Sequence, residues 1–181
     1  MDTLTEHYEL FKGPCGDGDK GTFHSYIDTY EKYFNRFKDE KINLLEIGIL
    51  NGKSVKLWQS YFKNANIHAV DINDKTHLNL SNERIFIHND DATLKSFSEN
   101  FNKSCFSIII DDGSHLLNDQ INSFRNLKSK LIEGGLYIIE DVFFHHIEHI
   151  QKEFDNCFQV CNLLHERPNC PDNILMIYEN K

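Results

Sequence analysis

Residues 44–54 read Leu-Leu-Glu-Ile-Gly-Ile-Leu-Asn-Gly-Lys-Ser, and the rest of the chain is organised around this stretch. An apolar run ends at an acidic residue, Gly48 and Gly52 follow four positions apart, and an amphipathic segment comes next. This order predicts a buried strand, a tight loop and a helix. A helix N-terminus beside a glycine loop offers free backbone N–H groups and lets a ligand approach the backbone closely. The stretch therefore predicts the floor of a nucleotide-type cofactor site.

The composition is that of a globular domain, with 181 residues, 40% of them hydrophobic and 26% charged. The net charge of −9 argues against a general grip on the phosphate backbone of a nucleic acid and against binding to anionic membrane surfaces. No apolar run approaches the ~18 residues that a membrane span needs. A neutral or cationic small molecule, or a metal ion that offsets carboxylates, suits this charge better.

The five cysteines are odd in number and show neither zinc-knuckle nor redox C-x-x-C spacing. We interpret them as free thiols in a reducing compartment, with a metal-binding or disulfide role as the less favoured alternative. Residues 1–20 lack the apolar core of a signal peptide. Together these features predict a cytoplasmic protein.

Hydrophobic periodicity predicts alternating helices and strands after a short N-terminal helix and a glycine-rich loop over residues 13–21. An amphipathic helix of about four turns is expected over residues 23–37. Gly134 and Gly135 are expected to end a later helix. The strands are expected at residues 42–47, 67–72, 85–90, 106–111, 136–139, 158–164 and 174–178, and the later helices near residues 55–62, 94–101, 121–131 and 147–154.

This alternation predicts an α/β fold: a Rossmann-like, doubly wound, seven-stranded and mostly parallel sheet in a three-layer sandwich. The last two strands have no helix between them and are therefore expected to form an antiparallel pair. We expect residues 1–40 to form an N-terminal helical lid or cap on a Rossmann-like domain of residues 41–181, within one compact unit. Ligands on such sheets bind at the carboxyl ends of the strands.

The glycine loop and Asp71 suggest the kind of ligand. Asp71 ends the second strand, where a carboxylate can hold the two hydroxyls of a ribose. The Gly-x-x-x-Gly pattern lacks the middle glycine that accommodates a pyrophosphate, so an adenosine without a diphosphate is favoured over a dinucleotide. The alternative is that both glycines serve only as turns.

Two acidic motifs close the fourth and fifth strands, Asp-Asp-Gly-Ser-His at 111–115 and Glu140-Asp141. These strands should be neighbours, which brings Asp112, Glu140 and Asp141 to one edge. Three carboxylates need a counter-charge, and a hard divalent cation such as Mg²⁺ supplies it. His115 is placed to take a proton. The alternative is a pair of solvated acidic loops whose aspartates cap the following helices.

Other histidines are less informative. His145 and His149 share a helical face, and a polar surface is favoured over a zinc site because the helix supplies no third ligand. His24, Tyr26 and Tyr30 on the first long helix could line a pocket, although Tyr30 fits the core equally well.

Taken together, the glycine loop, Asp71, Asp90, the Asp-Asp-Gly-Ser-His motif and Gly-Gly-Leu-Tyr-Ile-Ile-Glu-Asp at 134–141 resemble class I S-adenosylmethionine-dependent methyltransferases. More narrowly, they resemble the metal-dependent sugar O-methyltransferases of the mycinamicin and macrocin type, which act on deoxysugars of macrolides. The similarity runs from about Gly16 to Val142.

The resemblance implies a role for each matching residue. It implies that Asp112, Glu140 and Asp141 bind Mg²⁺ and that His115 is the general base. Gly-Asp-Lys-Gly at 18–21 resembles the family's lid segment, with Gly18 in the place of a threonine. The cofactor-binding residues implied are Glu46, Gly48, Gly52, Ser54, Asp71, Asp90 for the adenine amine, Asp111, and Lys20, His24 and Tyr26 from the lid.

The expected function is thus S-adenosylmethionine- and Mg²⁺-dependent O-methylation of a sugar hydroxyl on a small-molecule saccharide or glycosylated metabolite. The long N-terminal domain of some family members has no counterpart here, so we expect a substrate pocket that is smaller, open, or completed by a second subunit in a homodimer. A related branch is cephalosporin hydroxylase-like, which leaves a metal-dependent oxygenase as a second hypothesis. Against it, common iron triads use two histidines, and this edge offers one. A non-catalytic cofactor-binding partner module is the third.

Overall fold

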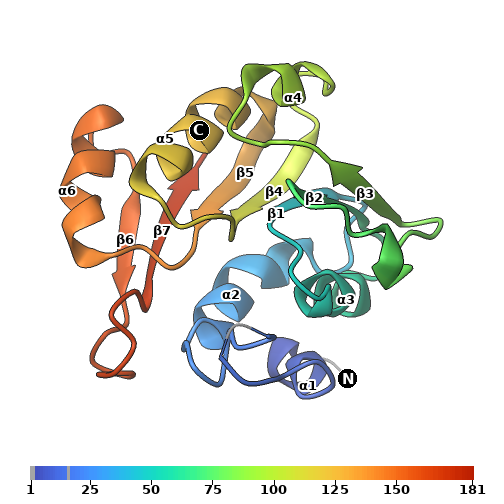
Figure 1. Ribbon diagram of the computed structural model, residues 1–181, viewed down its shortest axis with the longest axis horizontal. Coiled ribbons are helices and arrows are strands. Elements are labelled where there is room, and N and C mark those ends of the chain that lie inside the picture. Colours follow the sequence, from blue (N-terminus) through green and yellow to red (C-terminus); the bar gives the residue numbers. More distant parts are fainter. Residues whose placement is uncertain (1–2, 16) are drawn as a thin grey trace.

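A seven-stranded sheet forms the centre of the protein, in the strand order β3-β2-β1-β4-β5-β7-β6 (Figure 1). The computed structural model describes residues 3–15 and 17–181, so Gly16, where the family resemblance starts, lies outside it. Strands β1 to β5 run parallel, and β7 runs antiparallel to both β5 and β6. The strands are β1 (Asn43–Ile47), β2 (Asn66–Asp71), β3 (Ile85–Asn89), β4 (Phe106–Asp111), β5 (Leu131–Ile139), β6 (Gln159–Asn162) and β7 (Ile174–Glu179).

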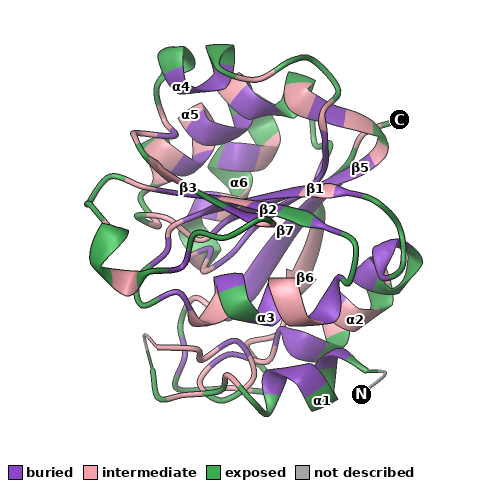
Figure 2. Ribbon diagram, turned by 90° about the vertical axis from the view of Figure 1, so that its right-hand side faces the viewer, coloured by how far each residue is buried: buried purple, intermediate pink, exposed green. Residues whose placement is uncertain are grey.

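Helices cover both faces of this sheet and make three layers (Figure 2). Helices α1, α2 and α3 lie on one face, and α4, α5 and α6 lie on the other. The predicted doubly wound fold with an antiparallel C-terminal strand pair is therefore confirmed. No helix of the described part of the chain is long and apolar enough to cross a membrane. The helices are α1 (Leu4–Tyr8), α2 (Ile27–Phe34), α3 (Lys53–Tyr61), α4 (Lys95–Glu99), α5 (Leu117–Leu127) and α6 (Phe144–Glu153).

Two hydrophobic cores follow from the alternation of side chains along the strands. In β4, Ile108 and Ile110 point into the core beneath α2 and α3, whereas Ile109 points into the core beneath α5 and α6. All six residues of β4 are buried, which is why its sequence reads as an almost continuous apolar run. Helices α1 and α2 share the first core with α3, and α1 packs on α2 and α3 on the side away from the sheet.

The predicted helix over residues 23–37 is too long at its N-terminal end. Helix α2 begins at Ile27, and the carbonyl oxygen of Asp19 accepts the backbone N–H groups of three residues, Thr22, Phe23 and His24. Tyr26 then donates its own N–H to the carbonyl of Lys20, 2.8 Å away. These bonds fold residues 19–26 into a turn, so His24 and Tyr26 are buried loop residues that precede the helix.

Gly134 and Gly135 were expected to end a helix, and this expectation is wrong. They lie inside β5, which begins at Leu131 beside Phe106 of β4. The N–H of Gly134 donates to the carbonyl of Asn180 at 2.7 Å, and the N–H of Asn180 donates to Gly135 at 2.9 Å. The pairing with β4 shifts register here, so the glycines form an irregularity within a strand.

Candidate active site

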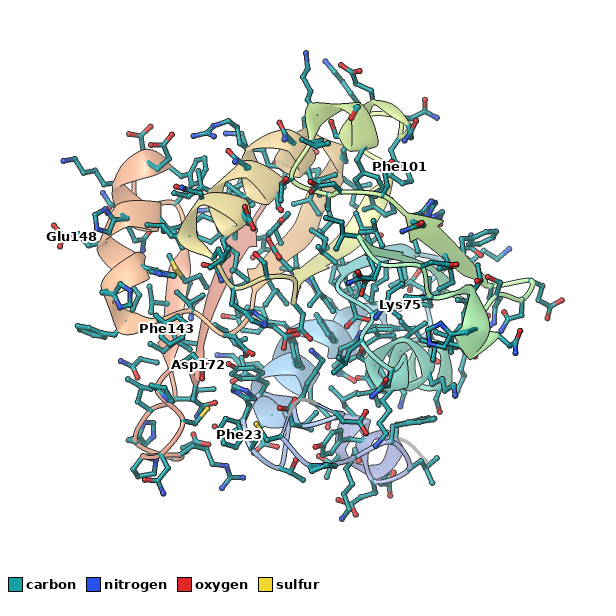
Figure 3. The ribbon with its side chains drawn as sticks, viewed as in Figure 1. Phe23, Lys75, Phe101, Phe143, Glu148 and Asp172 are labelled. Carbon is teal, nitrogen blue, oxygen red and sulfur yellow. The ribbon has the colours of Figure 1, made fainter. Side chains whose placement is uncertain are left out.

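The carboxyl ends of β1, β4 and β5 lie side by side, as the strand order requires. The ladder continues one residue past the strands, because the N–H of Asp112 donates to Ile47 at 3.0 Å and the N–H of Glu140 donates to Asp111 at 2.9 Å. The acidic residues that follow β4 and β5 therefore share one edge of the sheet. In Figure 3 this edge lies between the labelled side chains of Lys75 and Asp172.

Lys20 lies between two of these acidic side chains. Its ammonium group donates to Asp112 Oδ2 and to both carboxylate oxygens of Glu140, each at 2.6 Å. The hydroxyl of Tyr30 also donates to Glu140. Lys20 and Glu140 are both buried. The N-terminal segment thus places one positive charge among the carboxylates at the strand ends.

The carboxylates at this edge carry an excess of negative charge even with the ammonium group of Lys20 among them. Burial, together with repulsion from Asp112, raises the pKa of Glu140 well above its usual value. The same two causes raise the pKa of Asp141. Burial alone would lower the pKa of Lys20, but the charges of Asp112 and Glu140 hold it well above its usual value. One ammonium group therefore does not neutralise three carboxylates, and the edge favours further positive charge.

A cation could bind where Asp112, His115 and Asp141 meet. One donor atom from each of these residues lies within 4.8 Å of the others. His115 Nε2 is 3.8 Å from Asp141 Oδ2, while Asp141 Oδ1 accepts a hydrogen bond of 2.8 Å from Tyr26. The oxygen-rich donors and the excess negative charge fit a hard divalent cation such as Mg²⁺. Of the predicted metal ligands, Asp112 and Asp141 lie in this group, and Glu140 lies beside Asp112 on the Lys20 side.

His115 has features of a reactive residue. Its backbone adopts a φ of 58°, a conformation that residues with a side chain seldom adopt. Its Nδ1 is buried and has no hydrogen-bond partner among the residues that the structure describes. Asp141, opposite it, also has a positive φ, of 53°. Such conformations concentrate at functional sites, where the surrounding structure holds them in place.

The glycine loop brings the backbone of β1 against the loop after β4. Gly48 has a φ of 91°, and a β-carbon there would lie 2.0 Å from the carbonyl oxygen of Asp112. Asp71 fixes the same loop, because its Oδ2 accepts from the N–H of Ile49 at 3.0 Å and its Oδ1 from Asn73 at 2.8 Å. The loop conformation therefore depends on both the glycine and the acidic strand end.

Gly48→Ala is expected to lower the free energy of unfolding by about 2–5 kcal/mol. Backbone strain contributes about 1–2 kcal/mol, and the displacement of Asp112 contributes about 1–3 kcal/mol. Urea denaturation measures the loss. Gly134→Ala is the matched control, since its φ is 72° and no described atom lies within 4 Å of the added carbon. Equal losses in the two variants would contradict the close contact with Asp112.

Two adjoining cavities open at this edge and share Gly48, Asp71, Asn73 and Gly113. Most of the predicted cofactor and metal residues reach one of them. The predicted residues that line the first cavity are Lys20, Gly48, Ser54, Asp71, Asp112, His115 and Asp141, and those that line the second are Gly48, Asp71, Asp90 and Asp111.

Other predicted cofactor residues line neither of these two cavities. Glu46 is fully buried and accepts hydrogen bonds of 3.0 Å from Ser54 and from Trp58, and burial raises its pKa to about 7. Gly52 begins α3 with a φ of 75°. His24 and Tyr26 are buried beside Asp141. Glu46 thus contacts Ser54, and His24 and Tyr26 contact Asp141, and both contacted residues line the first cavity.

Asp111 is buried in the wall of the second cavity. Burial raises its pKa to about 7, although the hydroxyl of Tyr137 donates to its Oδ2 at 3.2 Å and opposes the shift. Asp111 therefore holds a proton more readily than an exposed aspartate does.

Several residues of the site were not identified from the sequence. Lys20 was assigned to a lid, but its bonds to Asp112 and Glu140 were not foreseen. Asp17 lines the first cavity and pairs with Lys53 at 2.9 Å, again without a sequence signal. The helical spacing of Tyr30 did indicate an inward-facing side chain, and its hydroxyl contacts Glu140.

Comparison with known proteins identifies relatives, although no family model matches. A tetracenomycin-C 2′-O-methyltransferase from Streptomyces olivaceus, which modifies the 8-demethyl-8-alpha-L-rhamnosyl compound, is 31% identical over 133 residues, 68% of this chain and 35% of the relative. Demethylmacrocin O-methyltransferase from Streptomyces fradiae is 31% identical over 132 residues, 68% of this chain and 33% of the relative. The chain thus spans about a third of the length of these relatives.

Among solved structures, the MycE methyltransferase of the mycinamycin biosynthetic pathway, in complex with Mg, SAH and mycinamycin VI, matches with a TM-score of 0.67. It is 30% identical, and the match covers 78% of this chain and 37% of that one. The fold and these similarities place the chain among the class I S-adenosylmethionine-dependent methyltransferases. Within that class, its relatives are the sugar O-methyltransferases.

Proposed function

We propose that this chain carries the catalytic site of an S-adenosylmethionine- and Mg²⁺-dependent O-methyltransferase that acts on a sugar hydroxyl of a saccharide or glycosylated small molecule. The observation that carries the proposal is the meeting of Asp112, His115 and Asp141 beside the glycine loop. Two relatives that are 31% identical support the same chemistry: the 2′-O-methyltransferase of an 8-demethyl-8-alpha-L-rhamnosyl tetracenomycin C, and demethylmacrocin O-methyltransferase.

The two adjoining cavities are the proposed site of S-adenosylmethionine. Gly48 and its loop would border the methionine part, Asp71 the ribose and Asp90 the adenine. When bound, this cofactor supplies a methyl group that its sulfonium makes electrophilic. The chain's own task is then to hold the acceptor hydroxyl in line with that methyl group, and such alignment is worth ~7–11 kcal/mol of the barrier.

The proposed Mg²⁺ ligands are Asp112, Glu140 and Asp141. When bound, the ion acts as a Lewis acid that lowers the pKa of a coordinated sugar hydroxyl. Lys20 already donates hydrogen bonds to two of these side chains, so it must give up at least part of these contacts when a metal ion binds.

We propose that residues 1–40 act as a lid on the domain of residues 41–181, because Lys20 brings the N-terminal segment to the strand ends.

The proton of the acceptor hydroxyl is proposed to go to the imidazole of His115. The carboxylate of Asp141, 3.8 Å from His115 Nε2, stabilises the positive charge that the ring then carries. Tyr26 fixes that carboxylate through its hydroxyl, so the base and its acidic neighbour keep their relative orientation.

Calorimetry with S-adenosylmethionine and a screen of sugar acceptors with labelled cofactor and Mg²⁺, read by mass spectrometry, test this function. Binding of the cofactor, transfer of label to a saccharide, and loss of transfer in EDTA with recovery in Mg²⁺ are expected. No cofactor binding at millimolar concentration would contradict the proposal. Full activity after EDTA treatment would contradict the metal assignment alone.

A further inference from the structure

A second group of potential metal ligands lies on the far side of Asp141 from His115. The donor atoms of His24, Cys170 and Asp172 all lie within 4.8 Å of one another. His24 and Cys170 are buried, and Asp172 is half-buried. His24 comes from the turn before α2, whereas Cys170 and Asp172 come from the loop between β6 and β7. The group therefore joins two segments that are remote in sequence.

The spacing of these donor atoms matches that of a tetrahedral metal site. Cys170 Sγ is 3.3 Å from His24 Nδ1 and 3.3 Å from Asp172 Oδ1. A tetrahedral zinc ion binds sulfur at about 2.3 Å and nitrogen at about 2.0–2.1 Å, which puts two such donors about 3.5 Å apart. A zinc ion therefore needs only small movements of these side chains.

The imidazole of His24 is fixed before any ion binds. It stacks on Tyr26 at 4.8 Å between ring centroids, and Phe23 packs edge-on at 5.1 Å. Its Nε2, on the opposite side of the ring from Cys170, faces Asp19 Oδ2 at 3.8 Å. Histidines that bind metals usually present their other nitrogen to a carboxylate or carbonyl, which fixes the ring orientation.

Two hydrogen bonds beside the three potential ligands also join the turn before α2 to the β6–β7 loop. The N–H of Ser25 donates to Asn173 Oδ1 at 3.1 Å, and Asn173 Nδ2 donates to the hydroxyl of Ser25 at 2.9 Å. These two bonds involve the neighbours in sequence of His24 and Asp172. They keep the three donors together without help from an ion, which lowers the ordering cost of binding one.

We propose that His24, Cys170 and Asp172 form a binding site for a thiophilic divalent cation, of which Zn²⁺ is the best match to this donor set. Cys170 binds as the thiolate, and its proton passes to the solvent buffer. The bound ion fastens the β6–β7 loop to the N-terminal segment that carries Lys20. The proposal does not rest on methyl transfer, because none of the three residues is a proposed Mg²⁺ ligand or the proposed base, although His24 Nδ1 also lies 3.5 Å from Asp141 Oδ1.

Cobalt substitution tests this site in the full chain. Chelator-treated protein, kept reduced with a phosphine, is titrated with Co²⁺ and followed by absorption spectroscopy. A thiolate-to-cobalt charge-transfer band that saturates at one ion per chain and disappears when Zn²⁺ is added is expected. Cys170→Ser abolishes the band. Cys105→Ser is the matched control, because Cys105 is a half-buried thiol at the opposite edge of the sheet, before β4.

Two milder variants keep the test valid if Cys170→Ser misfolds. Asp172→Asn and His24→Gln preserve side-chain size and are expected to weaken Co²⁺ binding about tenfold or more with an unchanged far-ultraviolet circular dichroism spectrum. Asp112→Asn is expected to keep the band, which separates this site from the proposed Mg²⁺ site. Absence of the band in the unmodified protein, or its persistence in Cys170→Ser, would overturn the proposal.

Discussion

Replacing His115 with alanine is expected to lower the rate of methyl transfer by about 10²–10⁴-fold and to leave the affinity for S-adenosylmethionine nearly unchanged. The imidazole lies beside the carboxylate of Asp141 and lines the cavity, but the glycine loop and Asp71 form the wall where the cofactor is proposed to bind. Removing the side chain therefore removes the proposed base without altering that wall. Steady-state kinetics measure the first effect, and calorimetry measures the second.

His145→Ala is the matched control for this variant. His145 is exposed on α6 and does not line either of the two cavities. Its replacement is expected to leave the rate and the cofactor affinity unchanged. If His115→Ala retained more than a tenth of the normal rate, another group would have to accept the proton.

Lys20→Met is expected to lower the free energy of unfolding by about 3–5 kcal/mol in the presence of EDTA, because it leaves buried carboxylates without their counter-charge. Mg²⁺ is expected to recover much of this loss, since Asp112 and Glu140 are then open to the ion. In the unmodified protein the stabilisation by Mg²⁺ should be smaller, because the ion has to displace the ammonium group. Urea denaturation with EDTA and with Mg²⁺ measures both quantities.

Lys53→Met provides the comparison. Lys53 and Asp17 form a pair in which each side chain is about a third exposed, so its loss should cost no more than about 1 kcal/mol in either condition. A loss in Lys20→Met that is large and the same with and without Mg²⁺ would mean that the ion does not use the carboxylates that Lys20 contacts.

Local sequence patterns correctly predicted elements in which every residue is buried. Strand β4 matches its predicted bounds because an entirely buried strand is apolar throughout. The same reasoning placed Asp112 next to Glu140, since the ends of neighbouring parallel strands meet. The helix predicted over residues 23–37 was wrong at its N-terminal end. His24 and Tyr26 lie in a buried turn, and the spacing of apolar residues does not distinguish a buried turn from the buried face of a helix.

Contacts between segments that are distant in sequence could not be predicted, because they leave no pattern in the local sequence. Lys20 and Asp112 are 92 residues apart, and His24 and Cys170 are 146 apart. Gly134 and Gly135 were predicted to end a helix because their hydrogen-bond partner, Asn180, is remote in sequence. Asn180 follows the last strand of the sheet, so nothing near the glycines indicated a strand. Each of these features depends on tertiary pairing, which propensity and periodicity do not contain.

The buried ammonium group of Lys20 also bears on when the strand ends acquire their arrangement. In many small metalloproteins the ligands stay apart until the ion arrives, so that metal binding and folding are one event. Here a side chain of the protein itself holds Asp112 and Glu140 together. We therefore expect the polypeptide to complete its fold without divalent ions, and binding of the proposed Mg²⁺ would then exchange one cation for another on a finished scaffold.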